Sequence, residues 1–506
     1  MIKPQLLKTK KMTKELLNTL LVLLGAAIYT IVFWGEKMGL NVLIYASFLV
    51  GALYILEKEA FEDKAIKVAA GGVLLSAILV VTHNSALVKF VHFLCVGVLS
   101  GLTQYRQLRF VGYAFLLYCG NLFEAPIRSI TEILKLPRLG RNRVSSNFGL
   151  SSLWLSILIV PIFYFIYYSA NPEFAALSDS FWASVFSILS FDWQWGKIFF
   201  FLIGLIITGA TLWKHTWINY DYYATFQENL DASKLKQDQT NIDKTYRESL
   251  VLLATLNVLL CLNNIIDLST VWNKMNVARS PLALKQYVHN GTYILIAGII
   301  LAIIVVSQIF KGKLNFYNQN QTLKTLAYVW IGQNALLTLT VATRNWQYIA
   351  SCGLAYKRIG VVIFLLLVVI GLLFISLKIR DQRSIYYVVV RMGWAVYFVL
   401  LASCLVPWDS YITRYNINAF AKNKMIDLPF LINDVSDKNI AVLIENKDFL
   451  KNINQSTLQY NENGYNNQIF VEQAIQNKVN TFISNQSEYS LWSWNLPDAH
   501  TKSVIK

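Results

Sequence analysis

Four polar side chains interrupt an apolar stretch that is long enough to cross a membrane. The stretch Leu250–Trp272 reads LVLLATLNVLLCLNNIIDLSTVW, and about 20 apolar residues in a helix span the hydrocarbon core of a bilayer. Its polar residues are Asn257, Asn263, Asn264 and Asp267. At roughly 100° per residue they fall within an arc of about 120°. Because lipid cannot satisfy a carboxylate, we expect this face to look into a helix bundle or a wet cavity.

A second apolar stretch, Leu326–Arg344, has a polar face of its own. Thr340 and Arg344 each fall within about 20° of Gln333 around a helix axis. Both stretches are expected to run outward, so Asp267 and Arg344 should lie at similar depth near the outer interface and form an ion pair. Three alternatives remain open: the pair only fixes helix register, it belongs to a substrate or ion path, or the two residues do not meet.

Two further residues are weaker site candidates. Arg391 lies about six residues into the last apolar stretch, where we expect its side chain to snorkel to the inner surface. His289, with Asp267, is the only acid–base candidate for an envelope enzyme. The chain contains no P-loop, HExxH or nucleophile elbow, and its cysteines and histidines lack metal-ligand spacing. We therefore predict no catalytic residue, no metal and no cofactor, and the sequence favours a protein that is not an enzyme.

The composition is that of a membrane protein. Of 506 residues, 55% are hydrophobic and 15% are charged, and the mean hydropathy is +0.43, whereas soluble proteins carry about 25% charged residues. From Pro407 onward there are 9 Lys/Arg and 10 Asp/Glu, so the net charge of +16 resides in the apolar part. No basic, aromatic-interleaved soluble module is present. The expected partner is the lipid bilayer and not nucleic acid; protein partners stay open.

Apolar stretches separated by charged loops predict an all-α transmembrane helix bundle of about eleven spans, with a small helical C-terminal soluble region. The spans are expected at about 16–34, 40–56, 68–81, 88–103, 150–168, 197–213, 250–272, 291–310, 326–343, 360–377 and 385–406. The basic N-terminus is predicted to be cytoplasmic. An odd number of crossings then places the C-terminus outside the cell inner membrane.

The apolar segment Phe110–Leu122 is predicted not to cross the membrane. It is only about 13 residues long, which is typical of an interfacial or re-entrant segment. The basic loop Arg128–Arg143 that follows should be cytoplasmic by the positive-inside rule. Four spans before that loop satisfy this expectation, whereas five would place the loop outside.

The predicted organisation has six parts. They are an N-terminal transmembrane bundle (1–124), a basic cytoplasmic loop (125–149), a transmembrane pair with an outer amphipathic helix (150–214), a cytoplasmic loop (215–249), a C-terminal transmembrane bundle (250–406) and an extracytoplasmic helical region (407–506). In the last part, helical spacing predicts that Phe430, Leu431, Val435, Ile440 and Leu443 are buried.

Several segments in the second half together resemble a known family. They are YVHNGTYILI, LAYVWIGQNALLTLTVATRNWQYIASCGLAYKRIGVVIF, DSYITRYNI and LWSWN. They resemble a bacterial polytopic membrane-protein family catalogued as domain of unknown function 4173, which is related to domain of unknown function 4153. The residues that match the family pattern are Arg344, Tyr348, Gly353, Leu354 and Arg358, and His289 stands where that pattern has a basic residue, often Arg. The resemblance implies a bundle of transmembrane helices and does not imply any particular activity.

Three classes of function stay open. A structural or transport-like helix bundle would explain the many spans and the polar interior, and is the interpretation that we prefer. A sensory or scaffolding protein would explain the outer C-terminal region. An envelope lipid-modifying enzyme would need acid–base residues at the outer interface, for which the sequence offers only Asp267 and His289.

Overall fold

The protein is built of helices, as the sequence predicts. The computed structural model describes residues 3–105, 109–135, 154–188, 195–214, 228–229, 239–274, 296–317, 319–423, 426–451 and 471–505. No strand is present within these ranges, apart from one isolated bridge between Asn229 and Arg383. The all-α architecture is therefore confirmed.

Eight helices in the described part of the chain are long and apolar enough to cross a membrane. They cover Lys14–Phe33, Lys64–His83, Ala86–Gln104, Trp195–Leu212, Ile242–Ser269, Gln321–Cys352, Tyr356–Arg380 and Ile385–Ser403. Shorter apolar helices cover Leu40–Leu56, Val160–Ala170 and Ile296–Ile309. Each of the eleven predicted spans overlaps one of these helices, and the protein is embedded in a membrane.

Polar caps decide where several of the helices begin and end. Asp63 accepts a hydrogen bond from the Ala65 amide at the start of α3 (Lys64–His83), and Ser85 accepts one from the Val88 amide at the start of α4 (Ala86–Gln104). Between them Asn84 adopts a left-handed conformation with φ of 52°, which ends α3. The sequence THNSA therefore produces a tight antiparallel connection between two long apolar helices.

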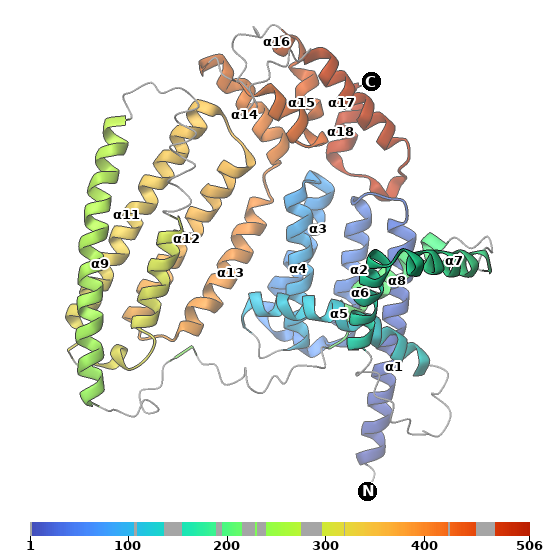
Figure 1. Cartoon of the computed structure of the whole chain (residues 1–506), viewed down its shortest axis with the longest axis horizontal. Coiled ribbons are helices and arrows are strands. Elements are labelled where there is room, and N and C mark those ends of the chain that lie inside the picture. Colours follow the sequence, from blue (N-terminus) through green and yellow to red (C-terminus); the bar gives the residue numbers. More distant parts are fainter. Residues whose placement is uncertain are drawn as a thin grey trace.

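One half of the molecule is an N-terminal bundle (Figure 1). It consists of α1 (Lys3–Phe33), α2 (Leu40–Leu56), α3, α4, α5 (Val111–Lys135) and α8 (Trp195–Leu212), whose buried side chains share one core. Glu57 forms ion pairs with Lys14 at 3.0 Å and with Lys214 at 3.5 Å. The start of the α1 span at Lys14, the end of α2 and the end of α8, which the sequence predicts to be cytoplasmic, thus meet at one place.

Helix α5 runs across the direction of α3 and α4 (Figure 1), and it is not among the helices that are apolar and long enough to span. Asn121 of α5 donates to the side-chain oxygen of Gln104 at 2.9 Å and to the carbonyl oxygens of Ala210 and Trp213 at 3.2 and 3.0 Å. These bonds satisfy carbonyl groups at the end of α8, which have no partner within that helix. The arrangement agrees with a segment that does not cross, and its sidedness stays a prediction.

Two predicted loop boundaries differ from the structure. The loop expected at 125–149 begins as helix, because α5 continues through Pro126 to Lys135. The reason is an unbroken buried stripe that includes Tyr118, Ala125 and Ser129, at the spacing of one helix face. The loop expected at 215–249 likewise ends in helix, since α9 begins at Gln239.

The other half is a C-terminal bundle of α9 (Gln239–Lys274), the helix Ile296–Ile309, α11 (Gln321–Cys352), α12 (Tyr356–Arg380) and α13 (Ile385–Ser403). Helix α13 lies next to the N-terminal bundle (Figure 1). Its Tyr397 is buried and donates to the Ala69 carbonyl oxygen of α3 at 3.4 Å. The outward-facing sides of the helices are apolar, as in the row Val258, Leu262 and Ile265 of α9, which suits a lipid surface.

The segments after α13 form a helical cap on the face opposite to the N-terminus (Figure 1). It comprises α14 (Trp408–Asn423), a π-helical turn (Phe430–Asp434), α15 (Ile440–Glu445), α16 (Lys447–Lys451), α17 (Val471–Gln486) and α18 (Leu496–Ile505). Leu431, Val435, Ile440 and Leu443 are fully buried in its core and Phe430 packs against them, so the predicted helical core is confirmed.

The lateral helix α7 (Pro172–Ile188) projects sideways from the N-terminal bundle (Figure 1). Its Leu177 and Phe181 are exposed. Both features fit the predicted amphipathic helix in an interface, because apolar side chains that no protein core covers are stable against lipid.

Candidate functional site

Two parallel helices, α9 and α11, are joined by polar side chains inside the C-terminal bundle. Asn257 of α9 donates to the Leu326 carbonyl oxygen at 3.1 Å, and Asn264 donates to the Gln333 carbonyl oxygen at 3.0 Å. The side-chain amide of Gln333 returns a bond to Asn257 Oδ1 at 3.1 Å. We call this row of part-buried contacts, with the ion pair described next, the polar seam.

The polar seam ends toward the cap in an ion pair between Arg344 Nη2 and Asp267 Oδ1. Both side chains are only 7% exposed. The predicted proximity of these two residues is confirmed. Removing two charges from water costs several kcal/mol per ion, so each charge depends on the other for its stability at this position.

Three buried acceptor oxygens on the seam have no hydrogen-bond donor among the residues that the structure describes. They are Asn264 Oδ1, Asp267 Oδ2 and Gln333 Oε1. A buried acceptor without a donor is costly, and nearly all such groups in proteins are satisfied. Oxygen atoms of carboxylates and amides are also the ligands that small hard cations prefer. The seam therefore has the chemistry to hold a proton, a water molecule or a small cation.

The other predicted site residues lie outside the seam or make different contacts. Asn263 is exposed, whereas its neighbour Asn264 is buried. Thr340 is buried, and its hydroxyl donates to the Leu337 carbonyl oxygen within α11 at 2.9 Å. His289 lies outside the described residues, so its proposed partnership with Asp267 stays a prediction.

Arg391 is not part of the seam either. It lies in α13 with its side chain 51% exposed, 3.8 Å from Glu228. Glu228 also lies 3.6 Å from Arg109, which precedes α5, and its carbonyl oxygen accepts a bond from the Ser384 amide at 3.0 Å. Arg391 therefore reaches the end of the bundle remote from the cap, as snorkelling predicts, and takes part in joining the two halves there.

The turn between α11 and α12 is a second polar assembly, which the sequence did not identify as a site. Gly353 has φ of +80°, a conformation that favours glycine. The Leu354 amide donates to Asn416 Oδ1 at 2.6 Å, and Asn416 donates back to the Leu354 carbonyl oxygen at 2.9 Å. The Arg358 guanidinium lies 4.0 Å from the ring centre of Tyr348 and donates to the Cys352 carbonyl oxygen at 2.8 Å. The residues that match the family pattern thus include those that dock the cap onto this turn.

The cap is held to the N-terminal bundle by a separate set of bonds. The Leu40 amide donates to the Trp494 carbonyl oxygen at 2.9 Å, and Glu36 accepts bonds from the Ser490 amide at 3.1 Å. Both cap residues lie in or next to the segment LWSWN. The cap therefore bridges the cap-side ends of both halves.

A buried charge network lies within the cap. Lys438 pairs with Asp498, and Asp498 Oδ2 accepts bonds from Gln486 at 2.6 Å and from Asn495 at 2.8 Å. Nearby, Lys478 donates to the Val435 carbonyl oxygen at 2.8 Å and to Asn439 Oδ1 at 2.9 Å. Burial lowers the pKa of Lys478 to about 8, against the attraction of Asp437 and Asp409. Isolated charged residues in a polar segment gave no sequence signal for this network.

Within the described ranges, no three side chains of His, Cys, Asp or Glu come together as a possible metal site. The family described as Domain of unknown function (DUF4153) matches residues 69–446. No curated protein and no solved structure matches the chain.

Proposed function

The chain belongs to the DUF4153 family, and we propose that it is a transport-like helix bundle whose polar seam takes up a proton or a small cation. The observation that supports the proposal most is Asp267. One of its carboxylate oxygens meets Arg344, and the other has no donor among the described residues although it is buried. An ionisable group at such a position commonly marks an ion or proton pathway.

The neighbouring acceptors support the same function. Asn264 Oδ1 and Gln333 Oε1 are buried without a donor in the described part of the chain, and both side chains belong to the row that ends at Asp267. If the seam only fixed the register of the two helices, its donors and acceptors should satisfy one another. Each buried polar group without a partner costs about 1–3 kcal/mol. A cation, or a proton shared with water, would satisfy these oxygens.

The test uses the purified full chain in sealed vesicles that contain a pH-sensitive or a cation-sensitive dye. Gradients of protons, sodium and potassium are imposed one at a time, with the membrane potential clamped. We expect the wild type to dissipate one gradient and Asp267→Asn to reduce that flux at least about tenfold, the size expected when a charge-dependent binding step is lost.

Two adjacent asparagines supply the matched control. Asn264 lies in the seam and Asn263 is exposed on the same helix. Asn264→Ala should lower the flux and Asn263→Ala should leave it unchanged. A wild type that dissipates none of the gradients, or an Asp267→Asn variant that transports normally, contradicts the proposal and favours a purely structural seam.

The cap supports a second candidate, a sensory or scaffolding role. Asn416 of the cap makes two hydrogen bonds to the backbone of Leu354, which directly follows α11. Helix α11 is the helix that contains Arg344. A ligand that displaced the cap would therefore pull on the end of α11. Asn416→Leu should then change the proteolytic cleavage pattern of the 215–249 segment in inside-out vesicles, with cleavage unchanged in Asn480→Leu, a variant at an exposed α17 residue. Identical patterns in the wild type and both variants argue against signalling through the cap.

A further inference from the structure

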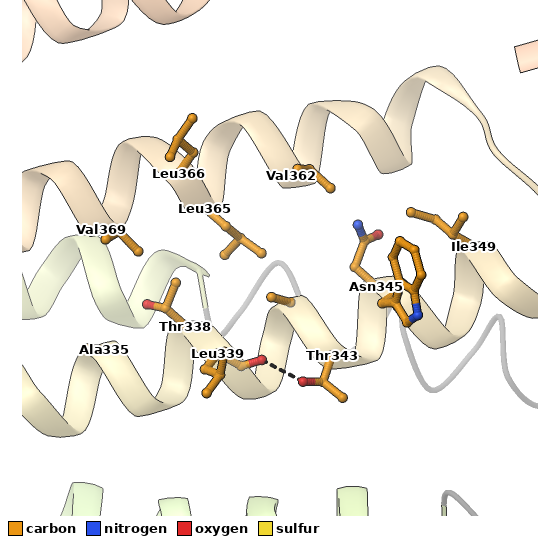
Figure 2. Close-up of a pocket in the computed structure, with 12 residues that line it drawn as sticks. Ala335, Thr338, Leu339, Thr343, Asn345, Ile349, Val362, Leu365, Leu366 and Val369 are labelled. Carbon is orange, nitrogen blue, oxygen red and sulfur yellow. Dashed lines mark hydrogen bonds between the residues drawn. The ribbon is translucent and has the colours of Figure 1, made fainter. Parts of the chain in front are cut away.

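An apolar groove runs between α11 and α12 on the side of α11 that faces away from the polar seam's partner, α9 (Figure 2). Its volume is about 540 Å³, within the range of about 300–1,000 Å³ that is usual for ligand sites. The α11 wall contains the small residues Ala335 and Ala342, two turns apart, and the α12 wall contains Leu365, Leu366 and Val369. Small side chains on one wall leave the space that the facing wall does not fill.

The groove has the depth of one bilayer leaflet. Its α11 wall extends from Ala335 to Ile349, which at 1.5 Å per residue is about 21 Å. One leaflet including its headgroup region is about 20–22 Å thick, half of the whole bilayer. Ile349 lies near the end of α11 that meets the cap, so the groove extends from the cap-side surface of the bundle toward its middle.

The groove is open to the surroundings of the bundle. Leu339 and Leu366 line it and are 63% and 51% exposed. On a spanning helix, exposed apolar side chains contact lipid tails. The molecule that fills the groove is therefore drawn from the bilayer.

Polar groups collect at the cap-side end of the groove. Asn345 and Trp346 line that end, and the Trp346 indole is 67% exposed, as for tryptophans at the level of lipid headgroups. Asn345 donates to the carbonyl oxygen of Arg358 at 3.1 Å. Arg358 lies one turn before the lining residue Val362, and next to it is Lys357, which is exposed. Lys357 and Arg358 thus lie in the first turn of α12, at the cap-side end of the bundle, and neither lines the groove itself.

We propose that this groove binds an acyl chain of an anionic phospholipid from the cap-side leaflet. The chain lies between α11 and α12, the Trp346 ring packs at the level of the glycerol, and Lys357 pairs with the phosphate. Arg358, whose guanidinium is engaged with Tyr348 and the Cys352 carbonyl oxygen, adds positive potential at the same end. Basic side chains beside a membrane surface select anionic headgroups in this way.

The experiment measures lipid retained by the full chain. The protein is incorporated in vesicles of equal parts phosphatidylcholine and phosphatidylglycerol, extracted in mild detergent, and examined by native mass spectrometry. We expect the wild type to retain phosphatidylglycerol at least about fivefold over phosphatidylcholine. Leu366→Trp, which fills the groove, should reduce the retained phosphatidylglycerol at least about fivefold.

Two further variants separate groove binding from general lipid adhesion. Leu373→Trp places the same ring at a position of α12 that is 58% exposed and outside the groove, and it should retain lipid as the wild type does. Lys357→Glu should abolish the preference for phosphatidylglycerol. The proposal is overturned if Leu366→Trp retains as much lipid as Leu373→Trp, or if the wild type retains both lipids equally.

Discussion

The side-chain amide of Asn264 on α9 lies 3.0 Å from the carbonyl oxygen of Gln333 on α11. Two helical turns earlier, Asn257 makes the equivalent bond to Leu326 at 3.1 Å. In both bonds the acceptor lies 69 residues after the donor in the sequence. The two helices therefore run parallel, in one register over this part of the seam. The Asp267–Arg344 ion pair has an offset of 77 residues, eight more than the asparagine bonds, so the long Arg344 side chain reaches back toward the start of α11.

The first prediction concerns that ion pair. Asp267→Ala and Arg344→Ala should each lower the free energy of unfolding by about 3–5 kcal/mol, because each leaves one buried charge without its partner. The double variant should be less destabilised than the sum of the two, with a coupling of about 0.5–3 kcal/mol. Thermal and denaturant unfolding of the four proteins in one detergent measures the cycle. Additive losses would mean that the two side chains do not depend on each other.

Much of the seam could be predicted from the sequence because charges in apolar helices are conspicuous. A charged side chain in an apolar helix is costly unless it is paired, so an ion pair between Asp267 and Arg344 was the simplest expectation. The pattern could not separate Asn263 from Asn264. At 100° per residue Asn263 lies at the edge of the polar arc, about 40° beyond Asp267, and packing against α11 decided which asparagine is buried.

Other features depend on neighbours that a single sequence does not reveal. The helix through Pro126 is stabilised by contacts of α5 with α4 and α8, and tertiary packing overrides local propensity there. The groove between α11 and α12 requires Ala335 and Ala342 to face particular side chains of another helix. The docking of Asn416 onto Leu354 joins residues that are 62 positions apart.

The second prediction tests the turn that receives the cap. In Gly353→Ala the new Cβ atom would lie 2.4 Å from Asn416 Oδ1, at a residue with φ of +80°. The backbone conformation, with φ of 80° and ψ of −175°, alone costs a non-glycine residue about 1–3 kcal/mol, and the Asn416 bonds would also be displaced. We expect a loss of at least about 1–2 kcal/mol in unfolding free energy. Gly360→Ala, where a Cβ meets nothing within 4 Å, should be neutral or slightly stabilising; equal effects at both sites would contradict the docking.

The third prediction concerns Lys478 and pH. Its pKa falls from 10.5 to about 8 in the folded cap because burial disfavours the charged form. Below about pH 8, Lys478 is protonated in both the folded and the unfolded state, and the full cost of burying its charge lowers the stability of the folded cap. Between about pH 8 and 10.5 the unfolded state binds more protons, so stability rises with pH. Over this pH window, the unfolding free energy of the wild type should rise by on the order of 3 kcal/mol relative to that of Lys478→Met.

Unfolding of the cap, followed by tryptophan fluorescence from pH 7 to about 10.5, measures this difference. Lys502→Met, which removes an exposed charge from α18, is the control and should leave the pH profile parallel to that of the wild type. A wild-type profile that is also parallel to that of Lys478→Met would show that Lys478 titrates normally.

The fourth prediction places the two ends of the chain on opposite sides of the membrane. The N-terminus and the cap lie at opposite faces of the bundle (Figure 1), and the basic N-terminus favours the cytoplasm. Alkaline phosphatase fused after Lys506 should therefore be active, and a cytoplasmic fluorescent reporter at the same place should be dark. The reverse pair of results would invert the topology.

The fifth prediction concerns helix α5, whose two ends should face the same side. Arg109 precedes the helix with its side chain 72% exposed, and Ile130 near its other end is 53% exposed. In a background without the five native cysteines, Arg109→Cys and Ile130→Cys should both react with a membrane-impermeant maleimide only in inside-out vesicles. Ser129 would be a poor labelling position because it is buried and donates to the Ala125 carbonyl oxygen. Labelling of the two cysteines from opposite sides would show that α5 crosses, and it would move the basic segment after it to the other face of the membrane.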